Sequence, residues 1–95
     1  MIIREGERLL VQGPVTIATV TVLLAQARDL LAQDAGVLDF KGVTEVDSAA
    51  VALALECLRE ARRRKIVLSL ANLPEAMRNL AELYAVSELL QADPA

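Results

Sequence analysis

Histidine is absent from this 95-residue sequence, and cysteine occurs only once, as Cys57. Without histidine the chain lacks the usual general base, the usual zinc ligand and the base of any Ser–His or Cys–His pair. The single thiol is flanked by apolar residues and cannot form a disulfide within one chain, so we predict an inert core residue. Asp39 and Asp47 could approach each other at one end of a sheet, but one carboxylate pair is weak evidence for catalysis. We therefore expect no enzymatic activity, no metal site and no cofactor.

Aromatic residues and long hydrophobic runs are also scarce. Aromatic residues make up 2% of the chain, and the longest uninterrupted apolar run covers only residues 49–55. Because a membrane-spanning helix needs about 20 apolar residues, we expect no direct membrane insertion. The first residues carry no apolar signal region with a cleavage site, so a cytoplasmic location is expected. The net charge of -3 argues against nucleic acid as the main ligand.

Apolar residues as a class are nevertheless abundant, at 55% of the chain, and the mean hydropathy is +0.41. A chain this apolar buries enough surface to offset its ordering entropy, which excludes disorder. A domain of this length still leaves roughly a third of its unfolded-chain surface exposed. Either the core is unusually aliphatic, or part of the apolar surface belongs to a partner.

The apolar spacing predicts strands that alternate with helices. We expect strands at residues 2–4, 8–12, 37–40 and 66–70, with turns at Gly6, at residues 13–14 and at residues 41–42. Helices are predicted at residues 20–33, capped by Thr16 or Thr19, at residues 48–64, and from Pro74 to Tyr84. Val86, Leu89 and Leu90 suggest a last apolar contact. This pattern predicts an α/β fold, a small mixed sheet with its helices packed on it.

The only basic run is residues 62–65, Arg-Arg-Arg-Lys. One interpretation is a patch that binds phosphate or a lipid headgroup. The other is the last turn of a helix, where cations suit the partial negative charge of the helix end. The helix-stop signals favour the second interpretation.

The start of the predicted helix at residue 48 is the most informative segment. Asp47 and Ser48 are both good N-cap residues, and an anion placed on this helix start is favoured. A helical projection at 100° per residue puts charged side chains on the outward side of the C-terminal half, and Ala49, Ala52 and Leu53 on that side beside Ser48. Such a small apolar surface suits close docking of another protein's helix. Alternatively, the sheet twists over this end, or alanine serves helix propensity alone.

Residues 37–50, VLDFKGVTEVDSAA, resemble the core motif of STAS domains, the sulfate transporter and anti-sigma factor antagonist family. In that motif, a strand containing Asp is followed by a hydrophobic-Asp-Ser/Thr loop that opens a helix. The resemblance covers nearly the whole chain, so we expect residues 1–95 to form a single STAS domain. Residues 46–55, 72–77 and 80–86 are most similar to the MlaB-like STAS subunit of the Mla phospholipid (lipid-asymmetry) ABC transporter.

The resemblance implies a non-catalytic subunit that binds and regulates the cytoplasmic, MlaF-like ATPase of this transporter, and through it the membrane permease. The protein would then lie at the inner membrane through its partner and support outer-membrane lipid asymmetry. The alternative is an anti-sigma factor antagonist switched by phosphorylation of Ser48. Many such antagonists have glycine at the position of Ala50, which weakens that alternative. The predicted partner-binding or phospho-switch residues are Asp47, Ser48, Ala49, Ala52, Leu53 and Glu56, with Tyr84 as a possible docking edge.

Overall fold

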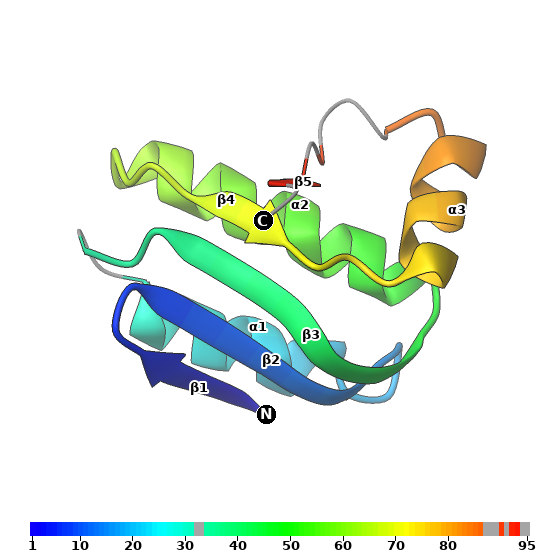
Figure 1. Ribbon diagram of the computed structural model, residues 1–95, viewed down its shortest axis with the longest axis horizontal. Coiled ribbons are helices and arrows are strands. Elements are labelled where there is room, and N and C mark those ends of the chain that lie inside the picture. The colour runs from blue at the N-terminus through cyan, green and yellow to red at the C-terminus, as the bar shows by residue number, and fades with distance from the viewer. Residues whose placement is uncertain (32–33, 87–89, 91, 94–95) are drawn as a thin grey trace.

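One sheet and a layer of helices make up the part of the chain that the computed structural model describes, residues 1–31, 34–86, 90 and 92–93 (Figure 1). The strands follow one another across the sheet in sequence order. Only β1 runs antiparallel to its neighbour, so the sheet is mixed. The strands are β1 (Ile2–Glu5), β2 (Arg8–Val15), β3 (Val37–Val46), β4 (Ser69–Ala71) and β5 (Ala92–Asp93). The predicted α/β class with a small mixed sheet is confirmed.

The helices are α1 (Val20–Leu30), α2 (Ser48–Arg63) and α3 (Glu75–Leu83). Figure 1 shows α1 and α2 side by side behind the sheet and α3 at one end of α2. Both α1 and α3 pack against α2, which is therefore the central helix of the layer. None of the described helices covers the opposite face of the sheet, which is turned to the viewer in Figure 1.

The first hairpin forms as predicted. β1 pairs with β2 from Ile2 opposite Val11 to Glu5 opposite Arg8, and Gly6 turns the chain with a positive φ of 63°. Glycine suits this position because it has no Cβ to clash in the left-handed region.

Two predicted turns are wrong, because β2 and β3 continue through them. β2 passes Gly13 and Pro14 and ends at Val15, with register shifts beside β3 before Gln12 and after Gly13. Proline is tolerated where the ladder is irregular, since a missing N–H then breaks no regular pair. In β3, a Cβ added to Gly42 would lie 3.2 Å from the carbonyl oxygen of Val11. Gly42 therefore lets the two strands approach closely rather than turning the chain.

The helix predictions are confirmed in position, and their ends differ in detail. Pro74 occupies the N-cap position of α3 rather than its first turn. Thr19 is the N-cap of α1 by position, but its hydroxyl donates to the carbonyl oxygen of Pro14 at 2.9 Å instead of capping the helix. Arg64 is the C-cap of α2, and Lys65 reverses the chain with a φ of 58°. The basic run therefore forms a helix end, as the favoured interpretation predicted.

The predicted strand at residues 66–70 is regular only from Ser69, and it extends to Ala71. The chain before it is held to the preceding helix, because the N–H of Ile66 donates to the carbonyl oxygen of Ala61 at 2.8 Å. Near the C-terminus, Val86 is half-buried and Leu90 is buried, whereas Leu89 lies outside the described residues.

The core lies between the sheet and the helices and consists mostly of aliphatic side chains around Phe40. Cys57 is part of it, and burial, the largest cause, raises the pKa of its thiol to about 12. Such a thiol is almost entirely protonated at neutral pH and therefore unreactive. The prediction of a core thiol is confirmed.

Candidate functional site

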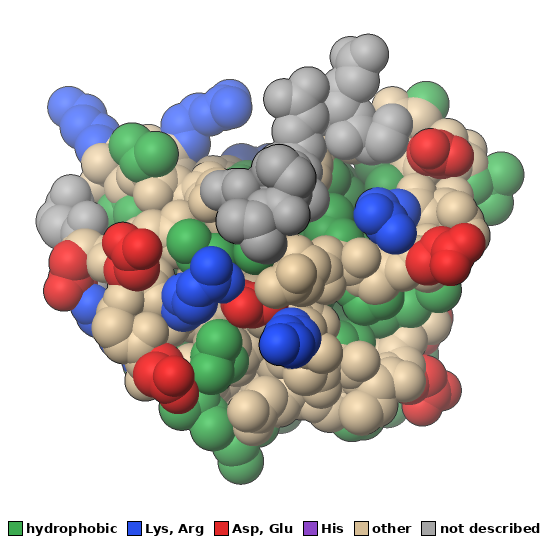
Figure 2. Space-filling view, viewed as in Figure 1, with side chains coloured by type: hydrophobic (Ala, Val, Ile, Leu, Met, Phe, Trp, Pro, Cys, Tyr) green, Lys and Arg blue, Asp and Glu red, His purple; other side chains and the backbone are tan. Residues whose placement is uncertain are grey.

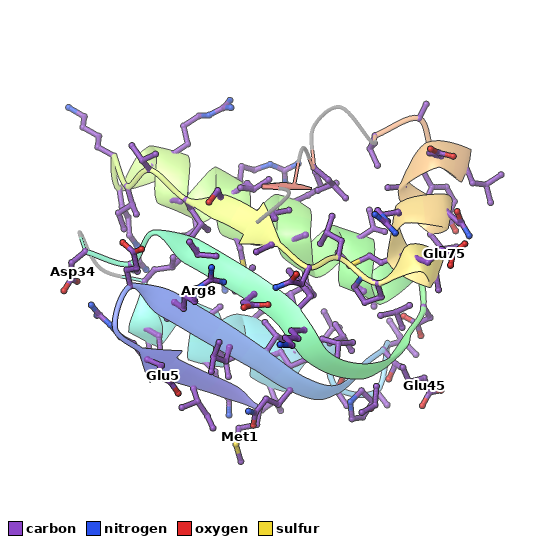
Figure 3. All side chains as sticks on the ribbon, in the orientation of Figure 1. Met1, Glu5, Arg8, Asp34, Glu45 and Glu75 are labelled. Carbon is purple, nitrogen blue, oxygen red and sulfur yellow. The ribbon has the colours of Figure 1, made fainter. Side chains whose placement is uncertain are left out.

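The connections that precede the three helices lie at one edge of the sheet, beyond the carboxyl ends of β2, β3 and β4 (Figure 1). Parallel strands place the helix starts together in this way, and ligand sites of α/β proteins occur at such edges. Figure 3 shows Glu45, at the end of β3, and Glu75, at the start of α3, on this same side of the molecule. The start of α2 lies between them along the chain.

Asp47 organises this edge by accepting hydrogen bonds with both carboxylate oxygens. Its Oδ1 accepts from the N–H of Ala49 at 2.8 Å, which caps α2 as predicted. Its Oδ2 accepts from the N–H of Ile17 at 3.0 Å, in the connection between β2 and α1. The backbone N–H of Asp47 also donates to the carbonyl oxygen of Val15 at 3.4 Å. One side chain thus joins the start of α2 to the neighbouring connection.

Ser48 is the first residue of α2, and its side chain is exposed. Asp47 already binds the first-turn amide of Ala49 with its side chain and that of Ala50 with its carbonyl oxygen, at 3.0 Å. Ser48 therefore does not cap the helix, and its hydroxyl is presented to the surroundings beside a carboxylate. A partner or a modifying enzyme can reach it there.

The prediction that Ala49, Ala52 and Leu53 lie on the outward side of α2 is partly wrong. Leu53 is only 1% exposed and belongs to the core, and Ala49 is only 7% exposed. The physical reason is that this flank of α2 faces α1, since Glu60, two turns after Leu53 on the same side of the helix, pairs with Arg28 of α1. The projection from the sequence assumed that α2 packs on the sheet alone. Leu53 and Ala49 therefore lie beneath the surface of the protein and do not form part of it.

The exposed side of the N-terminal half of α2 consists of Ser48, exposed Ala52 and half-buried Glu56, which pairs with Arg59. Beside the helix start lies Ile17, whose apolar side chain is 78% exposed. Sequence reasoning missed Ile17, although its signal was a large apolar residue in a connection between a strand and a helix. We call Ile17, Ser48, Ala52 and Glu56 the α2 docking face.

Tyr84 lies at the other end of α3 from Glu75, about 14 Å farther along at 1.5 Å per residue. It is the C-cap of that helix and is 51% exposed, next to exposed Leu83. The structure therefore does not bring Tyr84 together with the start of α2. Its role as a docking edge stays a prediction.

Sequence reasoning also missed a polar cluster on the open face of the sheet. Asp39 is buried there, and its Oδ2 accepts from Nη1 of Arg8 at 2.7 Å. Its Oδ1 accepts from the N–H of Lys41 at 2.9 Å and from Nδ2 of Asn72 at 3.0 Å. Figure 3 labels Arg8 on this face, and Figure 2 shows acidic and basic side chains together across it. The sequence did contain a signal for this cluster, because Asp39 is a charged residue between the apolar residues of a strand.

Burial of Asp39 opposes its ionisation, but the hydrogen bonds from Asn72 and Lys41 and the charge of Arg8 outweigh it. The pKa of Asp39 therefore lies below its usual value, and the group is a carboxylate at neutral pH. Asn72 adopts a φ of 56° at the end of β4, so the bond from its side chain fixes the turn that leads into α3. The hydrogen bonds of this cluster therefore connect β2, β3 and the turn that leads into α3.

The two carboxylates that could have formed an acid–base pair are far apart. Asp39 lies near the start of β3 and Asp47 just beyond its end, roughly 25 Å along an extended strand. Among the described residues, no group of three or more His, Cys, Asp or Glu side chains could hold a metal ion. Within the same part of the chain, no helix has the length and apolarity to cross a membrane.

Solved structures share this fold at low sequence identity. The anti-sigma factor antagonist SpoIIAA in its unphosphorylated form superposes with a TM-score of 0.70 at 15% identity, over 99% of this chain and 87% of that one. A sulfate transporter family protein from Wolinella succinogenes gives 0.64 at 16% identity, over 87% and 69% of the two chains. The much longer Mglu gives 0.58 at 24% identity, over 79% and 19%. No curated protein sequence matches the chain.

The family assignment comes from the sequence pattern as a whole. Residues 3–91 match the family described as "Mlab, STAS domain", which covers every helix and the first four strands apart from Ile2. The Asp-Ser loop that opens α2, and the strand that precedes it, lie inside this match. The chain belongs to the Mlab family of STAS domains.

Proposed function

We propose that this protein is a non-catalytic STAS subunit that binds and regulates the cytoplasmic ATPase of an ABC-type phospholipid transporter. Membership of the Mlab family supports the class of partner. The observation that carries the proposal is the α2 docking face, where exposed Ser48 and Ala52 lie beside the apolar side chain of Ile17. The protein would reach the membrane only through that ATPase.

The face has the chemistry of a protein interface. A small side chain at Ala52 lets another helix approach the backbone of α2 closely, and Ile17 offers an apolar anchor at its edge. Asp47 bonds the backbone of Ile17 and the first turn of the helix that carries Ala52, so little ordering accompanies docking. A cluster of apolar anchors surrounded by polar residues is typical of the centre of an interface.

Co-purification tests the proposal. The chain is co-expressed with the tagged ATPase of a phospholipid transporter and carries Ala52→Arg, which adds a long cation to the face without touching the core. We expect the complex to be lost while the far-UV circular dichroism spectrum stays unchanged. Gln12→Arg, an exposed site on β2 outside the α2 docking face, is the matched control and should bind normally. Unchanged binding of the Ala52 variant would contradict the proposal.

A second candidate function is a phosphorylation switch of the anti-sigma factor antagonist type. The exposure of Ser48 at a helix start supports it, because phosphate adds about -1.5 to -2 charges in the middle of the docking face. The carboxylate of Asp47 next to it works against that state by repulsion. Incubation with an anti-sigma factor kinase, followed by mass spectrometry, tests this function. An unmodified Ser48 would exclude it, with Ser48→Ala as the blank.

A further inference from the structure

The α2 docking face is too small to hold a partner protein by itself. It consists of Ile17, Ser48, Ala52 and Glu56, whereas each side of a stable protein interface contributes about 20–30 residues. The ATPase proposed above therefore has to cover surface next to this face as well. The charges on the neighbouring elements indicate which part of the surface that is.

The exposed surface at the start of α1 carries no charge. Residues 9–27 contain no Asp, Glu, Lys or Arg, although charged residues make up 24% of the chain. Within this stretch the apolar side chain of Val22 is 62% exposed, and Thr21 and Ala25 are exposed beside it. All three lie on the side of α1 opposite its buried residues. An uncharged, partly apolar surface therefore covers the first half of this helix.

The other neighbours of the α2 docking face are charged. Exposed ionisable side chains lie on α3, on the C-terminal half of α2 and at the end of β3, namely Glu75, Arg78, Glu82, Arg59 and Glu45. A charged group that loses its water at an interface weakens binding unless the partner pairs it. The centres of protein interfaces are accordingly poor in charged residues. The start of α1 is thus the neighbouring surface that best continues the docking face.

Ile17 connects the two parts of this surface. It lies in the connection that leads into α1, and its side chain is 78% exposed. Its N–H donates to Oδ2 of Asp47, the N-cap of α2, at 3.0 Å. Because α1 and α2 follow the parallel strands β2 and β3, their starts lie at the same edge of the sheet, and Figure 1 shows the two helices side by side. The starts of both helices therefore form one continuous surface around Ile17.

We propose that the ATPase covers the starts of both helices with an uncharged, apolar helix face, and that Val22 contacts this face. The inference rests on the proposed function and extends its interface from α2 to α1. Aliphatic side chains of the partner pack between Ile17 and Val22. A charged partner surface suits this site less well, because the carboxylate of Asp47 already accepts two backbone hydrogen bonds. A lipid surface also suits it less well, since membrane-binding helices carry Lys or Arg beside their apolar residues and residues 9–27 contain neither.

Affinity measurements test the inference. Biolayer interferometry gives the dissociation constant of the full chain with the immobilised ATPase of a phospholipid transporter. We expect Val22→Arg to raise it at least tenfold, because the cation finds no partner inside the interface, while the far-UV circular dichroism spectrum stays unchanged. Asp29→Arg is the matched control, since Asp29 is exposed two turns farther along the same side of α1, and should bind within twofold. For the natural chain, the constant should change less than threefold between 0.1 and 0.5 M NaCl.

Protection of an introduced thiol locates the contact. Cys57 is buried, so Val22→Cys supplies the thiol that reacts in the folded chain. We expect the ATPase to slow the reaction of this thiol with a maleimide at least tenfold, as followed by the mass of the chain. The thiol of Asp29→Cys should be slowed less than twofold.

The outcomes separate this inference from the proposed function. If Ala52→Arg loses the complex while Val22→Arg binds normally or the thiol at position 22 stays unprotected, the inference is overturned and the proposed function stands. Normal binding of Ala52→Arg, or no complex with the natural chain, would overturn both. A tenfold loss of affinity in 0.5 M NaCl would overturn the inference in favour of a charged partner surface. A dimer of the chain alone that Val22→Arg disrupts, or its co-sedimentation with phosphatidylglycerol vesicles, would overturn it in favour of a second copy or a lipid surface.

Discussion

Replacing Asp39 should reveal how much the polar cluster on the open face of the sheet contributes to the free energy of unfolding. In the structure, the carboxylate accepts three hydrogen bonds, from Arg8, Lys41 and Asn72. Hydrogen bonds to a charged group contribute about 1.5–3 kcal/mol each. All three donors regain some water when the carboxylate is lost, since the side chain of Arg8 is 39% exposed and Lys41 and Asn72 are exposed residues.

After that discount, we expect Asp39→Ala to lower the free energy of unfolding by about 3 kcal/mol at pH 7. Asp39→Asn keeps the shape and one acceptor oxygen, so about 1.5 kcal/mol is expected. Urea unfolding followed by far-UV circular dichroism measures both, and the alanine variant should lower the midpoint by about 2 M. Asp29→Asn, an exposed acid on α1, is the matched control and should change little.

The dependence on pH gives a second, independent check. The folded-state pKa of Asp39 is lowered, so its contribution to stability is present above the unfolded pKa of about 3.9 and is lost as the pH falls through the folded pKa. The difference between the natural chain and Asp39→Asn should therefore be full at pH 7 and shrink steadily below about pH 4. The lowered pKa values of Asp34 and Glu60 act equally in both proteins and cancel. Equal stability at pH 7, or a difference that does not shrink as the pH falls below about 4, would refute this reasoning.

Three further predictions concern the core and the cap. Asp47→Ala should cost about 1–2 kcal/mol in urea unfolding, because the α2 cap and the bond to Ile17 are both lost, whereas Asp47→Asn should cost less; equal costs would contradict the carboxylate's role. Leu53→Ala should lower the free energy of unfolding by about 3 kcal/mol, and a neutral result would mean that this side chain is not part of the core. Cys57 should not react with a thiol reagent at pH 8 until urea unfolds the chain, and rapid labelling of the folded protein would contradict its burial.

Features encoded by local spacing could be predicted from the sequence. The apolar period and the Asp47 cap defined the start and length of α2, and the Gly6 turn defined the first hairpin. The paths of β2 and β3 could not be predicted in this way. Gly13 and Gly42 read as breaks along the chain, but both lie inside strands. Gly13 has a φ of 84° beside a register shift, and Gly42 allows close approach of the neighbouring strand.

The candidate site was predictable only where it depends on the helix start. Asp47 and Ser48 followed from their sequence, and the exposure of Ala52 followed from the projection. The burial of Leu53 did not, because it requires the position of α1, which ends more than twenty residues earlier in the chain. Likewise, the partners of Asp39 come from β2 and from the end of β4, and no local pattern relates them.

The double hydrogen bonding of Asp47 has a mechanical consequence. Because its two oxygens bind different segments, a force applied at Ile17 is transmitted to the first turn of α2 without passing through the core. A binding partner that displaces either segment must move both or break one of these bonds. The two segments should therefore move together when a partner docks. Displacement of the β2–α1 connection should change the tilt of α2.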